Sequence, residues 1–134
     1  MAPSLAHGKI CYIEIPARDV AEAASFFETV FDWHIRRRDD GDVAFDDSVG
    51  QVSGTFVTGL PPTTEQGVFI HIMVRNVDTS MKAIAAHGGT IVEGPGRHLP
   101  EITARFADPS GNVWGLYQDR SLGGRRVRAI TAPR

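Results

Sequence analysis

Apolar and polar residues alternate along residues 9–15, near the start of the chain. One side of this segment carries Tyr12 and Glu14, and the other carries Cys11, Ile13 and Ile15. A period of two is typical of a strand with one buried face. We therefore predict a strand here, with Cys11 buried on its apolar side.

The period changes after Pro16. Asp19 is a good helix N-cap residue, and apolar side chains then recur at helical spacing as far as Trp33. Turn residues separate three further strand candidates, at 34–38, 42–46 and 51–58. The first half of the chain is thus predicted to be βαβββ.

The same order of patterns returns in the second half. Residues 68–74 alternate like a strand, Asp78 is the expected cap of a helix, and Gly88 and Gly89 predict its end. Three strands are again predicted, at 90–93, 102–107 and 112–118. The repeat of one βαβββ pattern is the main organisational feature of the sequence.

The last predicted strand follows a strong turn signal. Asp108-Pro109 opens the turn, and Gly111-Asn112 supplies the residues that favour positive φ. The apolar strand that follows contains Gly115, which places no side chain on either face of the sheet.

These segments together resemble the vicinal oxygen chelate superfamily, which includes glyoxalase I, bleomycin-resistance proteins and extradiol dioxygenases. The match covers most of residues 9–118. It is carried by Tyr12 to Pro16 with Asp19, Phe26-Phe27 through Val30 to Trp33, Val74 through Val77-Asp78, Gly88-Gly89, and Asp108 to Tyr117. Their order and spacing are specific for the fold, but this fold carries enzymes and binding proteins alike.

The resemblance implies an α+β fold. Paired βαβββ modules would form curved, cup-shaped mixed sheets with the helices on the convex side. We expect one glyoxalase/bleomycin-resistance-like domain over residues 9–118. Its modules would span 9–58 and 68–118 with a linker at 59–67, between an N-terminal tail at 1–8 and a basic, flexible C-terminal tail at 119–134.

Strand alternation then selects the residues of the cup. The candidate ligand-binding residues are Tyr12, Glu14, Phe69, His71, Arg105 and Tyr117. His71 and Glu14 are also candidate catalytic residues, because imidazole titrates near neutral pH and a carboxylate can orient the ring. His71 is equally consistent with a hydrogen-bonded histidine on the wall of the cup. Arg105 could bind an anionic or carbonyl group, or pair with Glu14.

The resemblance also places the family's metal ligands on Tyr12, Phe69, Gly115 and Gly54. None of these is His, Glu or Asp, so we predict no metal ligands and no cofactor. If the strand register were shifted by one residue pair, His71 and Glu14 would take the ligand positions of Phe69 and Tyr12. A divalent Mn, Ni, Zn or Fe ion is therefore kept as the alternative.

Composition limits the partners. The chain has 134 residues, a formal net charge of −2 and one cysteine. There is no broad positive charge to favour nucleic acid, and no apolar run long enough to span a membrane. A single cysteine excludes an intrachain disulfide and suits the cytoplasm. The open apolar edges that the resemblance implies lead us to expect a homodimer.

The sequence supports three interpretations of function. The first is a metal-independent member of the superfamily that binds a small organic molecule in its cup, for sequestration or for a lyase or isomerase step. The second is a divalent-metal-dependent enzyme of the glyoxalase or dioxygenase kind. The third is a non-catalytic interaction module.

Overall fold

Each half of the chain folds as a strand, a helix and three strands, as the repeated pattern predicts. The computed structural model describes residues 3–64 and 67–119. The chain divides into two units, residues 1–63 and 64–134. The predicted basic tail lies outside the described residues apart from Asp119.

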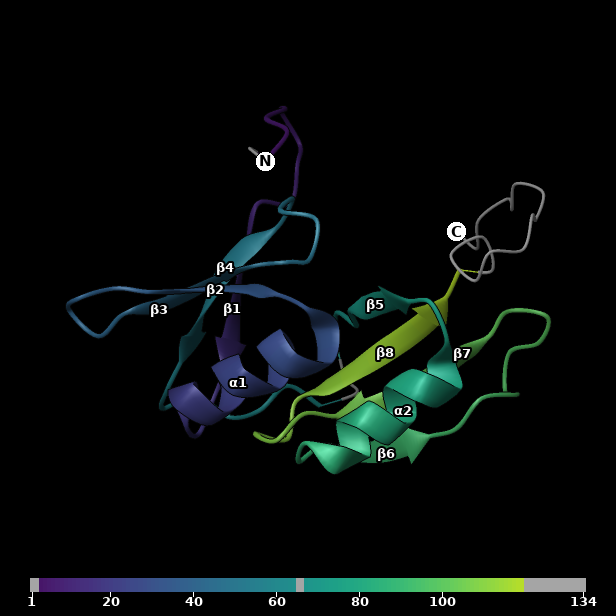
Figure 1. The fold of residues 1–134 in the computed structure, drawn as a ribbon. Coiled ribbons are helices and arrows are strands. Elements are labelled where there is room, and N and C mark those ends of the chain that lie inside the picture. The colour runs from purple at the N-terminus through teal and green to yellow at the C-terminus, as the bar shows by residue number, and fades with distance from the viewer. Residues whose placement is uncertain (1–2, 65–66, 120–134) are drawn as a thin grey trace. The chain divides into compact units, whose positions relative to one another are not determined.

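The first unit contains one helix and one four-stranded mixed sheet (Figure 1). Its elements are β1 (Tyr12–Pro16), α1 (Val20–Phe31), β2 (His34–Arg37), β3 (Val43–Asp46) and β4 (Ser53–Val57). The strand order is β1-β4-β3-β2, with β1 parallel to β4 and the other neighbours antiparallel.

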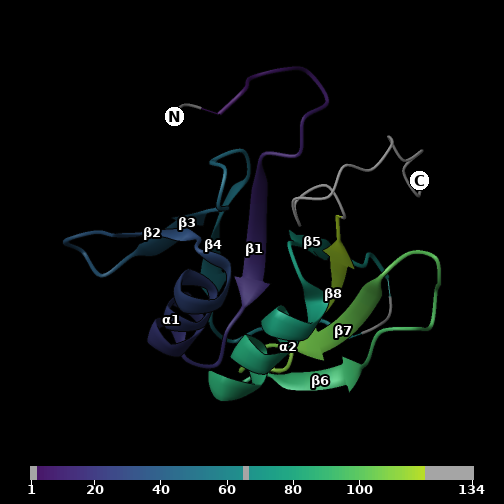
Figure 2. The same ribbon diagram turned by 45° about the vertical axis from the view of Figure 1, so that its right-hand side comes forward.

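The second unit repeats this plan. Its elements are β5 (His71–Val74), α2 (Val77–Ala86), β6 (Thr90–Glu93), β7 (Thr103–Ala107) and β8 (Val113–Gln118). The strand order is β5-β8-β7-β6, and β5 is parallel to β8. Helix α2 packs against β6, β7 and β8, as Figure 2 shows. The resulting α+β fold agrees with the expectation from the sequence.

The two helices begin at equivalent caps. The Asp19 carboxylate accepts a hydrogen bond from the Glu22 amide at 2.9 Å, as predicted. The prediction for the second helix was wrong, because Asn76 is the cap and Asp78 lies in the first turn. The Asn76 side chain accepts from the Thr79 amide at 2.8 Å, and an Asn cap is as favourable as an Asp cap.

Stacked aromatic rings fill the core of the first unit. Phe27 is fully buried, and its ring centroid lies 4.4 Å from that of Trp33. Trp33 in turn lies 4.7 Å from Phe45. Burial of such large rings is the main stabilising contribution available to a sheet with one helix.

The second unit buries both aliphatic and aromatic side chains between α2 and the sheet. Ile84 of α2, Phe106 of β7 and Leu116 of β8 are each fully buried. Ala104 and Trp114 are also buried, so every second residue of β7 and β8 faces the helix. The remaining residues of these strands, which include Thr103, Arg105, Gly115 and Tyr117, therefore face away from it. We call the side of each sheet that faces away from its helix the open face.

Cys11 is exposed, which corrects the prediction of a buried thiol. The predicted strand was too long at its start, because β1 begins at Tyr12 and leaves Cys11 outside the sheet. Among the described residues, no helix has the length and apolar character needed to cross a membrane.

Each unit contains an aspartate-centred turn before its last strand. Asp47 accepts from the amides of Gln51 and Val52, and Asp108 accepts from those of Ser110 and Asn112. Each turn closes through a glycine of positive φ, namely Gly50 and Gly111. Gly50 and Gly111 donate their amides to the carbonyl oxygens of Asp47 and Asp108, each at 2.9 Å.

Candidate functional site

A row of chemically active residues crosses the second sheet from edge to edge. The strand register pairs His71 with Gly115, Gly115 with Arg105, and Arg105 with Glu93. Paired residues of neighbouring strands project to the same face. The row therefore belongs to the open face of this unit, as the predicted alternation requires for His71 and Arg105.

The absence of a side chain at Gly115 makes room for His71. A Cβ atom at residue 115 would lie 2.7 Å from Nε2 and 2.9 Å from Cγ of the imidazole. Real Cβ atoms essentially never approach other atoms so closely. The ring of His71 thus occupies the space that any larger residue at position 115 would fill.

Phe69 connects the histidine to the arginine. Its ring centroid lies 5.2 Å from that of His71 in an edge-to-face arrangement. The guanidinium carbon of Arg105 lies 4.3 Å from the same Phe69 centroid. This cation–π contact fixes the height of the guanidinium group above the sheet.

Local electrostatics keep the imidazole neutral. Burial is the main cause that lowers the pKa of His71 below its ordinary value of 6.5, and the charges of Arg105 and His98 lower it further. A neutral imidazole has one nitrogen that accepts a proton or hydrogen bond and one that donates. His71 is therefore poised as a base rather than as a cation near neutral pH.

Sequence reasoning missed one polar residue of this face, Glu93, whereas the alternation along residues 102–107 predicted that Thr103 points to this face. Glu93 ends β6, and its Oε1 lies 3.4 Å from Nη1 of Arg97. Its Oε2 lies 3.8 Å from Nε2 of His98. Glu93 Oε2 and Thr103 Oγ1 are buried and have no hydrogen-bond partner. Strand alternation along β6 is the sequence signal that could have assigned Glu93 to a face. A register shift between Ile91 and Glu93 interrupts this alternation, so the face of Glu93 could not be read from it.

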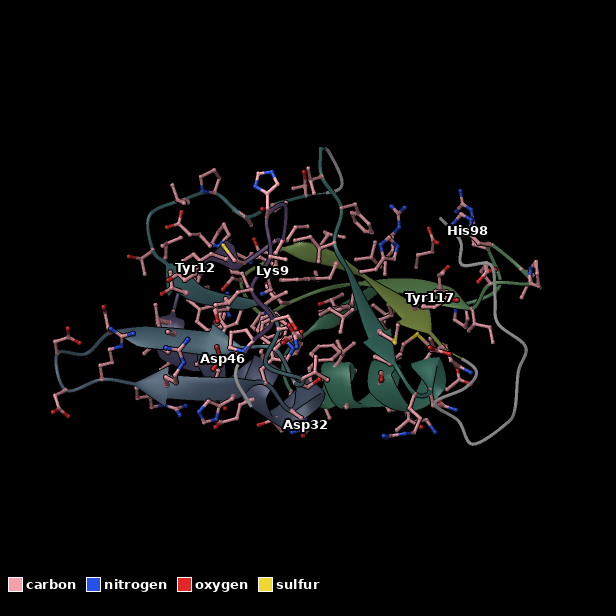
Figure 3. The ribbon with its side chains drawn as sticks, turned by 90° about the horizontal axis from the view of Figure 1, so that it is seen from above. Lys9, Tyr12, Asp32, Asp46, His98 and Tyr117 are labelled. Atoms are coloured by element: carbon pink, nitrogen blue, oxygen red, sulfur yellow. The ribbon has the colours of Figure 1, made fainter. Side chains whose placement is uncertain are left out.

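Tyr117 also lies on the open face of the second unit, beyond the polar row. It pairs with Thr103 on one side and with Met73 on the other. Figure 3 labels Tyr117 on β8 and His98 in the segment between β6 and β7. Of the six predicted ligand-binding residues, the structure thus brings Phe69 into contact with both His71 and Arg105, with Tyr117 on the same face.

Tyr12 and Glu14 belong to the first unit. Both are exposed on β1, where they pair with Ser53 and Thr55. That they share one cavity with His71 and Arg105 stays a prediction.

A fully paired network lies on the same face of the first sheet. The Asp46 carboxylate accepts from Nε and Nη2 of Arg36, both at 3.0 Å, and from the Ser53 hydroxyl at 2.6 Å. The hydrogen bond from Arg36 is the main cause that lowers the pKa of Asp46. Asp46 is labelled in Figure 3. The network joins side chains of the neighbouring strands β2, β3 and β4.

The register also corrects one position carried over from the family. Glu14 and His71 each lie five residues before their helix cap, Asp19 or Asn76. Glu14 pairs with Thr55 as His71 pairs with Gly115, so Thr55 is the counterpart of Gly115. Gly54 faces the helix instead, because a Cβ there would lie 2.8 Å from Cε2 of Phe45.

The residues present do not fit a metal centre. Tyr12, Phe69, Gly115 and Thr55 include no imidazole or carboxylate ligand, and the His71 ring covers Gly115. Within residues 3–64 and 67–119, no group of three His, Cys, Asp or Glu side chains could hold a metal ion.

Comparison with known proteins identifies the family. Residues 9–116 match the model of the Glyoxalase/Bleomycin resistance protein/Dioxygenase superfamily, so the chain belongs to this superfamily. A curated relative from Didymella fabae, a glyoxylase-like domain-containing protein, is 28% identical over 127 residues, which cover 82% of this chain and 93% of that protein.

Solved structures share the fold at low identity. A superfamily enzyme from Burkholderia phytofirmans has a TM-score of 0.67 at 17% identity, over 83% of this chain and 98% of that chain. The fosfomycin resistance protein of Listeria monocytogenes has a TM-score of 0.66 at 17% identity, over 84% and 91%. An antibiotic binding protein from Streptomyces has a TM-score of 0.65 at 20% identity, over 86% and 98%.

Proposed function

We propose that this protein binds a small organic molecule on the open faces of its sheets without a resident metal ion. The observation that carries the proposal is the set of side chains at the positions of the family's metal ligands. Tyr12, Phe69, Gly115 and Thr55 supply no imidazole or carboxylate there, but aromatic and hydroxyl groups can stack on an organic ligand or hydrogen-bond to it. Phe69, Arg105 and Tyr117 supply such groups on the same face.

Similarity to other family members supports binding as the primary role. One solved structure with this fold is named as an antibiotic binding protein and another as a fosfomycin resistance protein. The fold thus serves proteins that act on small molecules, and the chemistry must come from the site itself. In the second unit the ligand would meet His71 and Arg105, and Tyr12 and Glu14 are the candidate ligand-binding residues of the first unit.

Metal analysis and ligand titration test the proposal together. The full chain, purified without chelators, is examined by elemental analysis and by native mass spectrometry for a co-purified molecule. An NMR titration with a small-molecule library then reports which amides respond. We expect substoichiometric metal, and ligand-dependent shifts at β5, β7 and β8 that are lost in His71→Ala but kept in His7→Ala.

One tightly held Mn, Ni, Zn or Fe per chain, required for binding, would overturn the proposal in favour of a metal-dependent enzyme. No response to any compound would favour an interaction module.

A second candidate function is a metal-free lyase or isomerase step with His71 as general base. The specific observation behind it is the packing of the His71 ring over Gly115, together with the lowered pKa that keeps the ring unprotonated near neutral pH. Once a ligand is found, product analysis by mass spectrometry tests this step. Turnover that disappears in His71→Gln while binding remains would support it, and an unchanged ligand would support sequestration.

We also propose that the chain forms a homodimer. Tyr12 on β1 and Met73 on β5 are 54% and 56% exposed, and each lies on an edge strand of its sheet. Exposed apolar groups at a sheet edge favour association with another surface. Sedimentation equilibrium at micromolar concentration should give twice the mass of the chain, and a monomer would contradict the proposal.

For location, we propose the cytoplasm. The support is the exposed thiol of Cys11, the single cysteine of the sequence, which suits a reducing compartment. Fractionation of cells that produce the natural protein tests this proposal.

A further inference from the structure

Two buried oxygen atoms on the open face of the second unit lack hydrogen-bond partners, Oε2 of Glu93 and Oγ1 of Thr103. Glu93 pairs with Arg105, and Thr103 lies two residues before Arg105 on β7. Both side chains therefore project from neighbouring strands to the same face. A buried polar group without a partner is costly, and each such group in a native protein needs an explanation.

The chemistry of the two oxygens limits what can satisfy them. An ionised carboxylate only accepts hydrogen bonds, whereas a threonine hydroxyl both donates and accepts. A hydroxyl group of a ligand can donate its hydrogen to Glu93 and accept one from Thr103. An ether or carbonyl oxygen has no hydrogen to give to Glu93.

The charged side chains near Glu93 favour a hydroxyl group over a protonated amine on the ligand. Nη1 of Arg97 lies 3.4 Å from Oε1 of Glu93, and Arg105 is the register partner of Glu93, so two guanidinium groups belong to the surroundings of this carboxylate. Burial is the main cause of the lowered pKa of His71, and the charges of Arg105 and His98 lower it further, which agrees with a positive potential here. A protonated amine would be repelled here, whereas an anionic group on the same ligand would be attracted to Arg105.

Apolar surface adjoins this polar row. Met73 is 56% exposed, and Phe69 and Tyr117 are partly exposed on the same face. Methionine and aromatic side chains bind flat, polarisable rings well. These side chains suit an aromatic ligand ring better than a sugar or a flexible polyol.

We propose that the open face of the second unit binds an aromatic hydroxy acid, with its carboxylate toward Arg105 and its hydroxyl group between Glu93 and Thr103. The proposal rests on the small-molecule binding proposed above and specifies the class of ligand. Glu93 and Thr103 then act as specificity-determining residues that select ligands carrying a hydroxyl hydrogen.

NMR titration of the full chain, with EDTA present, tests this selectivity. The probes are benzoate, 3- and 4-hydroxybenzoate, and the two corresponding methoxybenzoates. We expect at least one hydroxybenzoate to bind about tenfold more tightly than benzoate, as a hydrogen bond to a charged group allows. Its methoxy ether should lose that gain, because it cannot donate a hydrogen.

Variants assign the gain to the two residues. Glu93→Gln and Thr103→Val should reduce the preference for hydroxybenzoate over benzoate to near onefold. Thr103→Ser, which keeps the hydroxyl, should retain it. Glu22→Gln on α1 and Thr79→Val on α2 make the same chemical changes on the helices and should leave the preference unchanged. Dispersed amide spectra confirm that each variant is folded.

Each outcome has a distinct meaning. Binding of benzoate and its derivatives without a hydroxyl preference overturns the ligand class while small-molecule binding stands. A preference that survives both Glu93→Gln and Thr103→Val overturns the assignment to these residues. If none of the probes binds but other library compounds do, the aromatic hydroxy acid is wrong and the proposed function is intact. If no compound binds, both proposals fail.

Discussion

The imidazole of His71 lies directly over Gly115, its partner in the parallel pairing of β5 and β8. The ring takes the space of a side chain at residue 115 and is itself partly shielded by this packing. The lack of a side chain at Gly115 therefore determines where the His71 ring lies on the neighbouring strand. Because this packing buries the ring, it also affects the pKa of His71.

Adding a methyl group at Gly115 should displace the ring. We expect Gly115→Ala to lower the free energy of unfolding by about 1–3 kcal/mol, because the new Cβ overlaps the imidazole. His71→Ala in the same chain should recover part of the loss, so the two changes are not additive. Urea denaturation measures both effects. Gly94→Ala is the control, because nothing lies within 4 Å of a Cβ there.

The same displacement should change the acidity of His71. Burial is the main cause of its lowered pKa, so expulsion of the ring in Gly115→Ala should raise the pKa toward 6.5. Titration of the imidazole protons by NMR measures the change. A pKa that stays low in this variant would contradict packing on Gly115 as its cause.

Stability should fall with acidity through the titration of His71. The pKa of His71 is lower in the folded protein than in the unfolded chain, so the folded protein binds the proton less readily. The contribution of neutral His71 to the free energy of unfolding is therefore fully present above pH 6.5 and is lost as the pH falls through the pKa of the folded state. Unfolding free energies measured from about pH 7.5 to about pH 5 should therefore decline less steeply in His71→Gln than in the unmodified protein. His87→Gln provides the matched control, because His87 is exposed beyond α2.

The Arg36–Asp46 pair should stabilise the first unit in a pH-dependent way. Its hydrogen bonds lower the pKa of Asp46, so the stabilisation is present above the ordinary value of 3.8 and is lost as the pH falls below the folded value. Arg36→Gln should cost about 0.5–1 kcal/mol near neutral pH, since both side chains are partly exposed. The difference should vanish in strong acid. Arg37→Gln, which breaks a more exposed pair with Glu28, should cost less.

The titration of Asp108 should change stability in the direction opposite to that of Asp46. It is 5% exposed, and burial is the main cause that raises its pKa above 3.8. The folded state binds this proton more readily, so stability falls as the pH rises from 3.8 through the folded value. Because Trp114 Nε1 donates to Asp108 Oδ2 at 3.1 Å, indole fluorescence reports this titration. Asp108→Ala should cost about 1–3 kcal/mol, because the donors of Asn112 and Trp114 lose their acceptor.

Local patterns were sufficient to predict the fold. Strand alternation placed His71 and Arg105 on one face, and the two βαβββ repeats defined the element order. The errors were at boundaries, where competing residues are chemically similar. Asn76 and Asp78 are both capping residues, and only the hydrogen bond to Thr79 distinguishes them.

The site was less accessible to sequence reasoning. Strand alternation in β7 predicted that Arg105 lies on the open face. The register shift in β6 prevented the same prediction for Glu93. The contact between His71 and Gly115 depends on register across two strands that are more than 40 residues apart in the chain. Single-strand patterns carry no such information.

The two units also differ in a way that bears on how such a protein changes over evolutionary time. Arg36 and Glu93 hold equivalent register positions, but Arg36 is engaged by Asp46, whereas Glu93 keeps a buried oxygen without a hydrogen bond. The first unit therefore satisfies this polar position with its own side chains, whereas the second unit retains a buried polar atom that lowers its stability. Substitutions that retune recognition can then accumulate in residues 64–134 without eroding the scaffold provided by residues 1–63.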